Sequence, residues 1–287
     1  MSTIDSEILE KSSRPQPQLK IRVPRGWAAL DLRSVWRFRD LCMAMALRDV
    51  KLRYKQTALG VIWVILQPLL AAGVFSFVFG TVAKMSSDGQ NHFLFSYVGM
   101  LAWGLFNSTV TKSSISLVGN SQLISKIFFP RLVLPLSTIP SALLDFAIAL
   151  AMLGGLMVIY HVHPTWGLVT LPLWVGLVLM LSAGIGLWTA ALTVPYRDVQ
   201  YILPVMMSIL LYGSPIGYSA RAVPANWLRV YQLNPLAPIL EGFRAAILGT
   251  AMPGKEWIVW CACVSAAVLL AGAYVFKHME RKFADVI

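Results

Sequence analysis

Four basic side chains, Arg48, Lys51, Arg53 and Lys55, lie within eight residues of one another, just before the first long apolar run. Ammonium point charges and guanidinium forks form charge-assisted hydrogen bonds with phosphate groups. The same cluster would equally anchor a chain at the cytoplasmic side of a membrane and contact anionic lipid. These residues therefore indicate either a phosphate site or a topological anchor.

Asp145 is the one charged side chain among the 63 residues from position 132 to 194. An ionisable group in such an apolar stretch pairs, protonates or faces water, and by default it suggests function. A lone carboxyl can instead stay neutral and hydrogen-bonded to a neighbouring helix. Asp145 thus indicates either a structural contact, which a single acid favours, or the ion site of a secondary carrier or channel.

Motifs for covalent chemistry are absent from the sequence. No phosphate-binding loop occurs, because Gly254-Lys255 is followed by Glu256, and there is no H-E-x-x-H, G-x-S-x-G or acidic cluster. His161 and His163 have no nearby carboxylate or thiol, and the three cysteines, at positions 42, 261 and 263, do not follow a zinc-ligand spacing. We expect no catalytic residue, no metal site and no ATPase activity in this chain.

The hydrophobic content and the apolar runs of the sequence indicate which helices hold these residues. Of the 287 residues, 57% are hydrophobic and 13% are charged, which is about half the charged share of a soluble domain. Apolar runs of roughly 20 residues, the length that crosses a bilayer, recur at residues 61–83, 93–110, 132–160, 166–194, 201–218 and 257–276. The sequence therefore predicts an all-α membrane protein with six transmembrane helices.

The net charge of +11 follows from topology under this assignment. With both termini in the cytoplasm, 19 of the 24 Lys and Arg residues fall on cytoplasmic segments and 5 on outer loops. Nucleic-acid binding is not needed to explain the charge. Residues 1–60 contain no cleavable secretory signal, so we expect the N-terminus to stay inside.

Residues 1–29 are expected to form a disordered cytoplasmic tail, and residues 30–60 an amphipathic helix followed by the basic entry segment. Apolar side chains gather on one face of that helix, and charged side chains gather opposite. The apolar set is Val35, Phe38, Leu41, Cys42 and Met45, and the charged set is Arg33, Arg37, Asp40, Arg48 and Lys51. Such a helix lies in the membrane interface or packs on a partner protein.

Four aromatic residues within the predicted spans, Phe75, Trp103, Trp188 and Tyr212, allow two interpretations. They could line a path along which the apolar faces of sugars stack, or they could pack in the core.

Several stretches together resemble permease subunits of type-2 ATP-binding cassette exporters, in the branch that exports O-antigen, capsular polysaccharide and teichoic acid. They are RDVKLRYKQTALGVIW at residues 48–63, QP at 67–68, KIFFPRLVLP at 126–135, YRDV at 196–199, SPI at 214–216, NPLAP at 234–238 and EGFR at 241–244. The resemblance covers nearly all of residues 30–276, and the SPI and NPLAP stretches look closest to O-antigen exporters.

The resemblance implies a homodimer in a bacterial inner membrane, docked on two cytoplasmic ATPase subunits that bind the ATP and Mg. It places coupling to those subunits at residues 114–130, with Lys126 and Arg131 as basic contacts, and at Arg197 and Asp198; topology anchoring would explain the same charges. The basic cluster at residues 48–55 would then hold the diphosphate of a polyprenyl-linked glycan. Residues 277–287 would be a cytoplasmic tail.

The proline-interrupted residues 219–255 match the family's re-entrant outer segment. Irregular backbone at membrane depth must be buried in protein or line water. We expect two short re-entrant helices, at residues 225–232 and 238–247, which form an outer gate with Pro215, Asn234 and Pro235. Glu241 and Arg244 lie three residues apart on one helical face and are expected to pair.

The sequence therefore predicts a permease subunit that moves a lipid-linked polysaccharide, with O-antigen favoured. A drug or lipid exporter of the same fold is one alternative. A secondary carrier or channel that uses Asp145 is the other.

Overall fold

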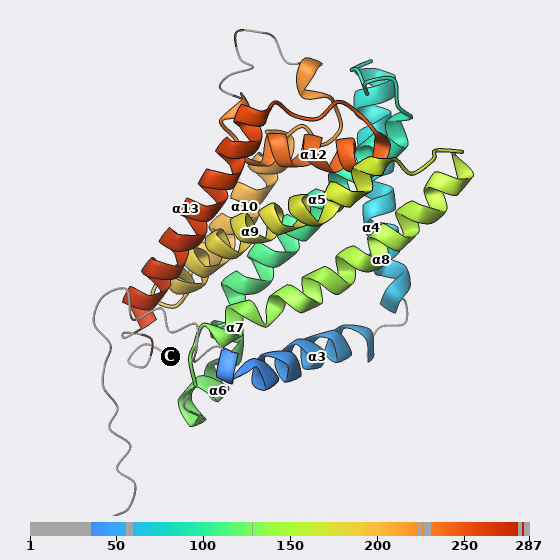
Figure 1. Ribbon diagram of the computed structural model, residues 1–287. Helices are drawn as coiled ribbons and strands as arrows, with labels where there is room; N and C mark the ends of the chain where they lie inside the picture. Colours follow the sequence, from blue (N-terminus) through green and yellow to red (C-terminus); the bar gives the residue numbers. More distant parts are fainter. Residues whose placement is uncertain are drawn as a thin grey trace, which may run out of the picture. The chain divides into compact units, whose positions relative to one another are not determined.

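The computed structural model describes residues 36–55, 60–127, 129–222, 226, 231–280 and 283, without the side chains of 53–55, 60, 61 and 64. These residues form helices, turns and loops, with no β-strand among them. The longer helices are α3 (Arg39–Lys55), α4 (Gly60–Phe75), α5 (His92–Ile115), α8 (Thr138–Ile159), α9 (Leu171–Thr193), α10 (Val199–Tyr212), α12 (Leu236–Leu248) and α13 (Lys255–Met279) (Figure 1). Shorter pieces are η2 (Ser76–Val82), η3 (Val118–Asn120), α6 (Ser121–Lys126), α7 (Val133–Leu136), η4 (Trp166–Thr170) and η5 (Ala220–Ala222). The predicted tail at residues 1–29 lies outside the described residues.

Five helical stretches are long and apolar enough to cross a membrane. They are Ile65–Val82, His92–Ile115, Val133–Ile159, Trp166–Thr193 and Lys255–Met279. The second stretch begins where the Asn91 side chain accepts hydrogen bonds from the backbone N–H groups of Phe93 and Leu94, which is the usual chemistry of an N-cap. These five stretches agree with five of the six predicted spans.

The predicted fifth span, residues 201–218, differs from the structure at its end. The helix α10 stops at Tyr212 after 14 residues, a length of about 21 Å, which is less than the roughly 30 Å of a hydrocarbon core. It ends at Gly213 and Ser214, because the residue before Pro215 disfavours helical dihedral angles. The prediction from hydropathy extended the helix over residues 213–218, whereas these residues form a turn and bends.

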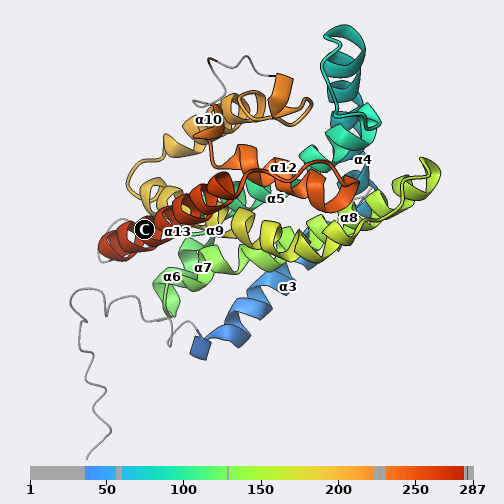
Figure 2. The same cartoon turned by 45° about the horizontal axis from the view of Figure 1, so that its top comes forward.

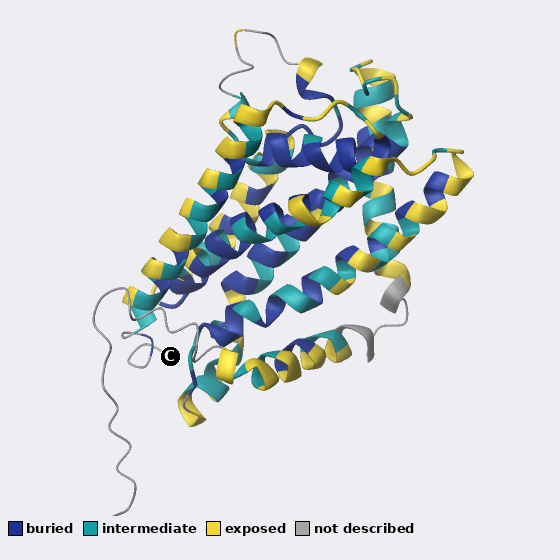
Figure 3. Cartoon of the chain, viewed as in Figure 1, coloured by how far each residue is buried: buried dark blue, intermediate teal, exposed yellow. Residues whose placement is uncertain are grey.

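The central helices of the bundle are α5 and α9, and α9 contacts both α5 and α13 (Figures 1 and 2). Side chains of α5 are buried along most of its length, whereas the outward side of α13 is exposed (Figure 3). Two glycines allow the close approach of α9 and α13. A Cβ on Gly272 would overlap the backbone carbonyl of Gly184, and a Cβ on Gly184 would lie 2.6 Å from the carbonyl oxygen of Val268. Small residues at such a crossing let the helix backbones pack closely in a membrane.

The helix α12 packs against α5, α9, η4 and α13 and buries 12 of its 13 residues. It lies across the ends of the neighbouring long helices in Figure 1. Gly242 is in contact with the Trp174 ring of α9, and any side chain at position 242 would overlap that ring. Gly249 ends the helix in the left-handed conformation, with φ of +70°. The predicted helix at residues 238–247 is thus present, whereas most of the one predicted at 225–232 lies outside the described residues.

The face of α3 that was predicted to be apolar turns toward the protein. Met45 is buried, and Phe38, Leu41 and Cys42 are partly buried in the cluster that also contains Val133 of α7. The outer side of this segment still carries exposed apolar side chains, among them Met43, Leu47 and Leu52, beside its charges. The described part of the predicted apolar face therefore packs on the rest of the chain. The opposite face is mixed, because it carries apolar side chains beside the charged ones.

Candidate functional site

A cavity of about 360 Å³ lies among α4, α5 and α8, and its lining residues belong to three of the candidate membrane spans. Its polar lining residues are Gln67, Asn107, Ser108, Thr111, Lys112 and Asp145, and its aromatic lining residues are Trp103 and Phe146. On α5, positions 104, 107, 108, 111 and 112 follow the three- and four-residue spacing of one helix face. One stripe of α5 therefore supplies most of the polar wall.

An ion pair forms one end of this wall. Lys112 Nζ lies 2.9 Å from Asp145 Oδ2 and donates a hydrogen bond of 2.7 Å to Ser141 Oγ. The side chains of Lys112 and Asp145 are 26% and 15% exposed. This pair gives Asp145 a counter-charge, which supports the structural interpretation over an ion site in a carrier. The prediction missed the pair because it ended the second span at residue 110, whereas α5 continues to Ile115.

The four predicted path aromatics lie in different surroundings. Trp103 is buried and lines the cavity. Phe75 is buried and stacks on Tyr212, with the ring centroids 6.2 Å apart, while Tyr212 itself is 66% exposed. Trp188 is exposed on α9. The structure thus places one of the four, Trp103, beside a cavity and joins two others into a contact between α4 and α10.

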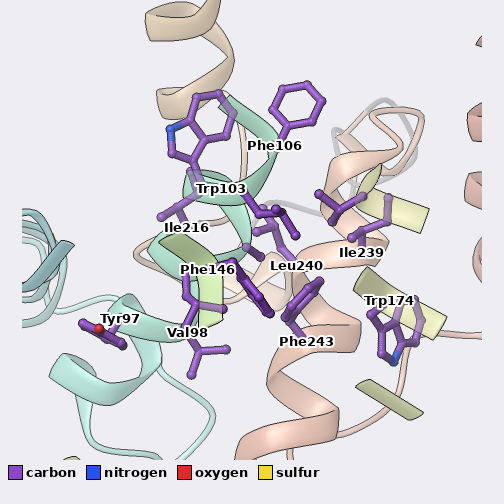
Figure 4. Packing of buried hydrophobic residues seen from close by; sticks show 14 of the residues in the cluster. Tyr97, Val98, Trp103, Phe106, Phe146, Trp174, Ile216, Ile239, Leu240 and Phe243 are labelled. Atoms are coloured by element: carbon purple, nitrogen blue, oxygen red, sulfur yellow. The ribbon is translucent and has the colours of Figure 1, made fainter. Parts of the chain in front are cut away.

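The cavity wall also meets α12. The Phe146 ring packs edge to face on Phe243, with centroids 6.1 Å apart and ring planes at 82° (Figure 4). Aromatic pairs of this geometry contribute about 0.5 to 1.5 kcal/mol beyond the area that they bury. The Phe146–Phe243 contact therefore joins the cavity directly to α12.

Arg244 of α12 is 1% exposed and connects three parts of the chain. Its guanidinium donates hydrogen bonds to the backbone carbonyls of Pro215, Ile216 (2.7 Å) and Tyr218 (3.4 Å). Its Cζ lies 3.8 Å from the ring centroid of Phe95 on α5, a cation–π arrangement. Burial lowers the pKa of Arg244 to about 10, so it stays charged at neutral pH.

The expected pair of Glu241 with Arg244 takes a different form. Among the described residues, no Glu241–Arg244 ion pair within 4.0 Å is present, because the guanidinium is turned toward the carbonyls of residues 215–218. Burial raises the pKa of Glu241, and the nearby Arg244 charge only partly opposes this effect. Both side chains line a polar cavity of about 170 Å³ together with Asp88, Arg221 and residues 250–254.

The SPI stretch at residues 214–216 and the NPLAP stretch at residues 234–238 contact each other. Asn234 donates from Nδ2 to Ser214 Oγ at 3.0 Å, and its Oδ1 accepts from the backbone N–H of Leu236 at 3.0 Å. Pro235 follows at the start of α12. The predicted gate residues Pro215, Asn234, Glu241 and Arg244 are therefore brought together by α12 and the turn after α10.

Of the four charged residues predicted for coupling, three are exposed and the fourth, Arg131, contacts Glu280. Lys126 is exposed at the end of α6, and Arg197 and Asp198 are exposed in the turn before α10. The backbone N–H of Arg131 donates to Glu280 Oε1 (3.2 Å), and its guanidinium donates to the Glu280 carbonyl (2.8 Å). Lys277 pairs with the same carboxylate at 2.6 Å. Glu280 thus joins the turn before α7 to the end of α13, a contact that no pattern in the sequence predicts.

The predicted phosphate cluster is only partly described. Arg48 pairs with Asp49 at 2.9 Å and donates to Asn120 Oδ1 at 2.8 Å, which connects α3 to η3. Lys51 is exposed. The side chains of Arg53 and Lys55 lie outside the described residues, so the structure shows no assembled phosphate site here.

Comparison with protein families matches residues 40–248 to the ABC-2 type transporter family. The chain belongs to this family. Its relatives include the O-antigen export system permease protein RfbA of Myxococcus xanthus, which is 27% identical over 89% of this chain and 98% of the relative. A protein of the same name from Klebsiella pneumoniae is 27% identical over 86% and 95%. The polysialic acid transport protein KpsM of Escherichia coli is 27% identical over 83% and 93%.

Within this ABC-2 family chain, the described residues hold no group of three or more His, Cys, Asp or Glu side chains that could bind a metal ion. Cys261 is buried, Cys42 is partly buried and Cys263 is exposed.

Proposed function

We propose that this chain is the permease subunit of an ATP-driven exporter that moves a polyprenyl-diphosphate-linked polysaccharide, with O-antigen as the favoured cargo. The observation that carries the proposal is the match to O-antigen export permeases over 95% or more of their length. The match to a polysialic acid transport protein extends the same substrate class. A polar, aromatic-lined cavity among the spanning helices is consistent with a hydrophilic cargo.

In this proposal the chain crosses the inner membrane six times and works as a homodimer. The helix α10 and the turn at residues 213–218 together make the fifth crossing. Both termini lie in the cytoplasm, a placement supported by the distribution of Lys and Arg residues. Two ATP-binding cassette subunits supply ATP hydrolysis and hold the ATP and Mg²⁺, since the sequence has no phosphate-binding loop of its own.

The proposed coupling surface comprises α6 and the turn before α10, with Lys126, Arg131, Arg197 and Asp198. The Glu280 contacts support this role, because they join the segment at Arg131 to the end of the spanning helix α13. Movement of the coupling segment would therefore reach α13, and through the glycine contact at residues 184 and 272 it would reach α9.

We assign Arg48, Lys51, Arg53 and Lys55 to the lipid diphosphate, and the outer segment of Pro215, Asn234, Pro235, Glu241 and Arg244 to the exit gate. The gate assignment is supported by the hydrogen bonds of Arg244. Its guanidinium holds the irregular turn after α10 to the buried helix α12. Irregular backbone at this depth is tolerated where it is covered by protein or lines a water path.

The test is reconstitution with the cognate ATPase in proteoliposomes loaded with the source organism's lipid-linked polysaccharide. We expect vanadate-sensitive ATPase activity and ATP-dependent glycan movement, both lost when the catalytic glutamate of the ATPase subunit is replaced by glutamine. Transport of a drug or a simple lipid, but not of glycan, would show that the proposed cargo is wrong. Activity that follows an ion gradient without an ATPase partner would overturn the proposal.

A further inference from the structure

The cavity among α4, α5 and α8 presents hydrogen-bonding groups of both kinds without net charge. Gln67 and Asn107 carry amides, and Ser108 and Thr111 carry hydroxyls. The charges of Lys112 and Asp145 oppose each other at 2.9 Å. A free anion or cation would have to break this pair to bind either partner. A neutral ligand with many hydroxyl groups would meet donors and acceptors together.

The other part of the wall is apolar. Trp103 and Phe146 line the cavity with Ala71, Met100 and Ala142. A sugar ring has one face of C–H groups and a rim of hydroxyls, so it matches an aromatic surface on one side and polar groups on the other. A hydrocarbon chain in this place would cover the polar stripe of α5 without satisfying it, which is costly.

The size of the cavity limits what it can hold. Its volume of about 360 Å³ lies at the lower end of the range of roughly 300 to 1,000 Å³ that is usual for small-molecule sites. One or two sugar rings fit this volume, whereas a folded length of polymer does not.

We propose that this cavity is a binding site for one or two neutral sugar units of the exported glycan, with the Trp103 side as the stacking surface and the α5 stripe as the hydroxyl-binding surface. The inference rests on the proposed function for the identity of the glycan. It adds a site within a single protomer, next to α12 through the Phe146–Phe243 contact.

Gly104 offers a selective way to fill the cavity. It lines the cavity on α5, and a Cβ built on it meets no atom within 4 Å. Gly104→Leu should therefore add a side chain at the wall of the cavity, where its Cβ has room. Gly154→Leu is the matched control, because Gly154 is an exposed glycine on the spanning helix α8, also has open space at its Cβ, and is not part of the lining.

In the reconstituted complex we expect Gly104→Leu to reduce glycan transport at least tenfold, with the complex still assembled. Gly154→Leu should transport within twofold of wild type. Equal transport by both variants would overturn the inference while leaving the proposed function intact. If wild-type protein moves no glycan, the proposed function fails, and the binding measurement below judges the cavity separately.

Binding is measured through a thiol introduced by Gly104→Cys in a chain that also carries Cys263→Ser, since Cys263 is exposed. The probes are polysaccharide released by mild acid from the lipid-linked pool and polyprenyl phosphate without glycan. We expect the polysaccharide to slow maleimide labelling at least fivefold and polyprenyl phosphate to have no effect. Protection by polyprenyl phosphate alone would assign the cavity to the lipid, and absence of protection by either probe would also overturn the inference.

Discussion

At the scale of single residues, Arg244 shows how a buried charge can organise irregular backbone. The carbonyls of residues 215, 216 and 218 face inward, and the planar guanidinium reaches all three while lying on the Phe95 ring. An ammonium group cannot reproduce this fork.

We predict that Arg244→Lys lowers the free energy of unfolding by about 3 kcal/mol, because hydrogen bonds to charged groups contribute about 1.5 to 3 kcal/mol each. Thermal unfolding of the purified protein in detergent measures the loss. Arg221→Lys is the control and should be neutral, because Arg221 is exposed and lines the polar cavity that Arg244 also lines. Unchanged stability of Arg244→Lys would contradict the role assigned to the guanidinium.

Glu241 provides a prediction on pH. Burial raises its pKa, so the folded chain holds this proton more tightly than the unfolded chain. Its contribution therefore becomes more favourable as pH falls through the raised pKa, and less favourable as pH rises. As pH falls from neutral, the thermal midpoint of wild type should therefore rise relative to that of Glu241→Gln. Parallel pH profiles of the two proteins would contradict the raised pKa of Glu241.

The Lys112–Asp145 pair is tested by exchange of charges. Lys112→Met leaves a partly buried carboxylate without this cation and should cost about 3 kcal/mol of stability. The double variant Lys112→Asp with Asp145→Lys restores opposite charges and should recover at least half of that loss, as measured by thermal unfolding. If the double variant is less stable than Lys112→Met, the ion pair is not the dominant interaction at this position.

The residues of the candidate site differ in how readily the sequence reveals them. Arg244 and Asn234 were singled out because they stand in stretches that resemble the exporter family. The partner of Asp145 was missed, because Lys112 was assigned to a cytoplasmic segment. Glu280 was missed because its contact with Arg131 joins positions 149 residues apart, and neither periodicity nor spacing reports such a contact.

At the scale of elements, hydropathy predicted five of the spanning helices, because a helix must bury about 20 consecutive apolar residues to cross a bilayer. Hydropathy predicted less well where turn residues or contacts with distant parts of the chain decide the structure. The end of α10 depends on Gly213 and Pro215 rather than on apolarity. The direction in which the apolar face of α3 points depends on the cluster around Val133, which does not adjoin it in sequence.

The contact of α9 with α13 is tested by enlarging a glycine. A side chain on Gly272 would overlap the backbone of Gly184, which cannot rotate away. We predict that Gly272→Leu forces the two helices apart and costs about 3 kcal/mol or more, at the upper end of overpacking effects. Gly176→Leu, on α9 with open space at its Cβ, is the control. Monodisperse protein yield and thermal midpoint measure both variants, and equal values would contradict the packing described here.

At the scale of the whole molecule, the orientation in the membrane is open to a direct labelling test. His163 is exposed in the loop between α8 and α9, and Lys126 is exposed at the end of α6. In a chain with Cys42 and Cys263 replaced by serine, we expect His163→Cys to react with a membrane-impermeant thiol reagent in spheroplasts. Lys126→Cys should react at least tenfold more slowly until the cells are permeabilised. The reverse pattern would invert the proposed topology.

The hydrogen bonds of Arg244 also set an order on biosynthesis. The turn at residues 215–218 leaves the ribosome before α12, so its carbonyls gain the Arg244 donors only after residue 244 has been made. A nascent chain that stops before α12 would also lack the helix that covers Trp174 and the Phe95 ring. Translation of residues 241–244 is therefore the step after which the turn at residues 215–218 can gain these hydrogen bonds. We predict that membrane quality-control proteases degrade chains truncated before this point.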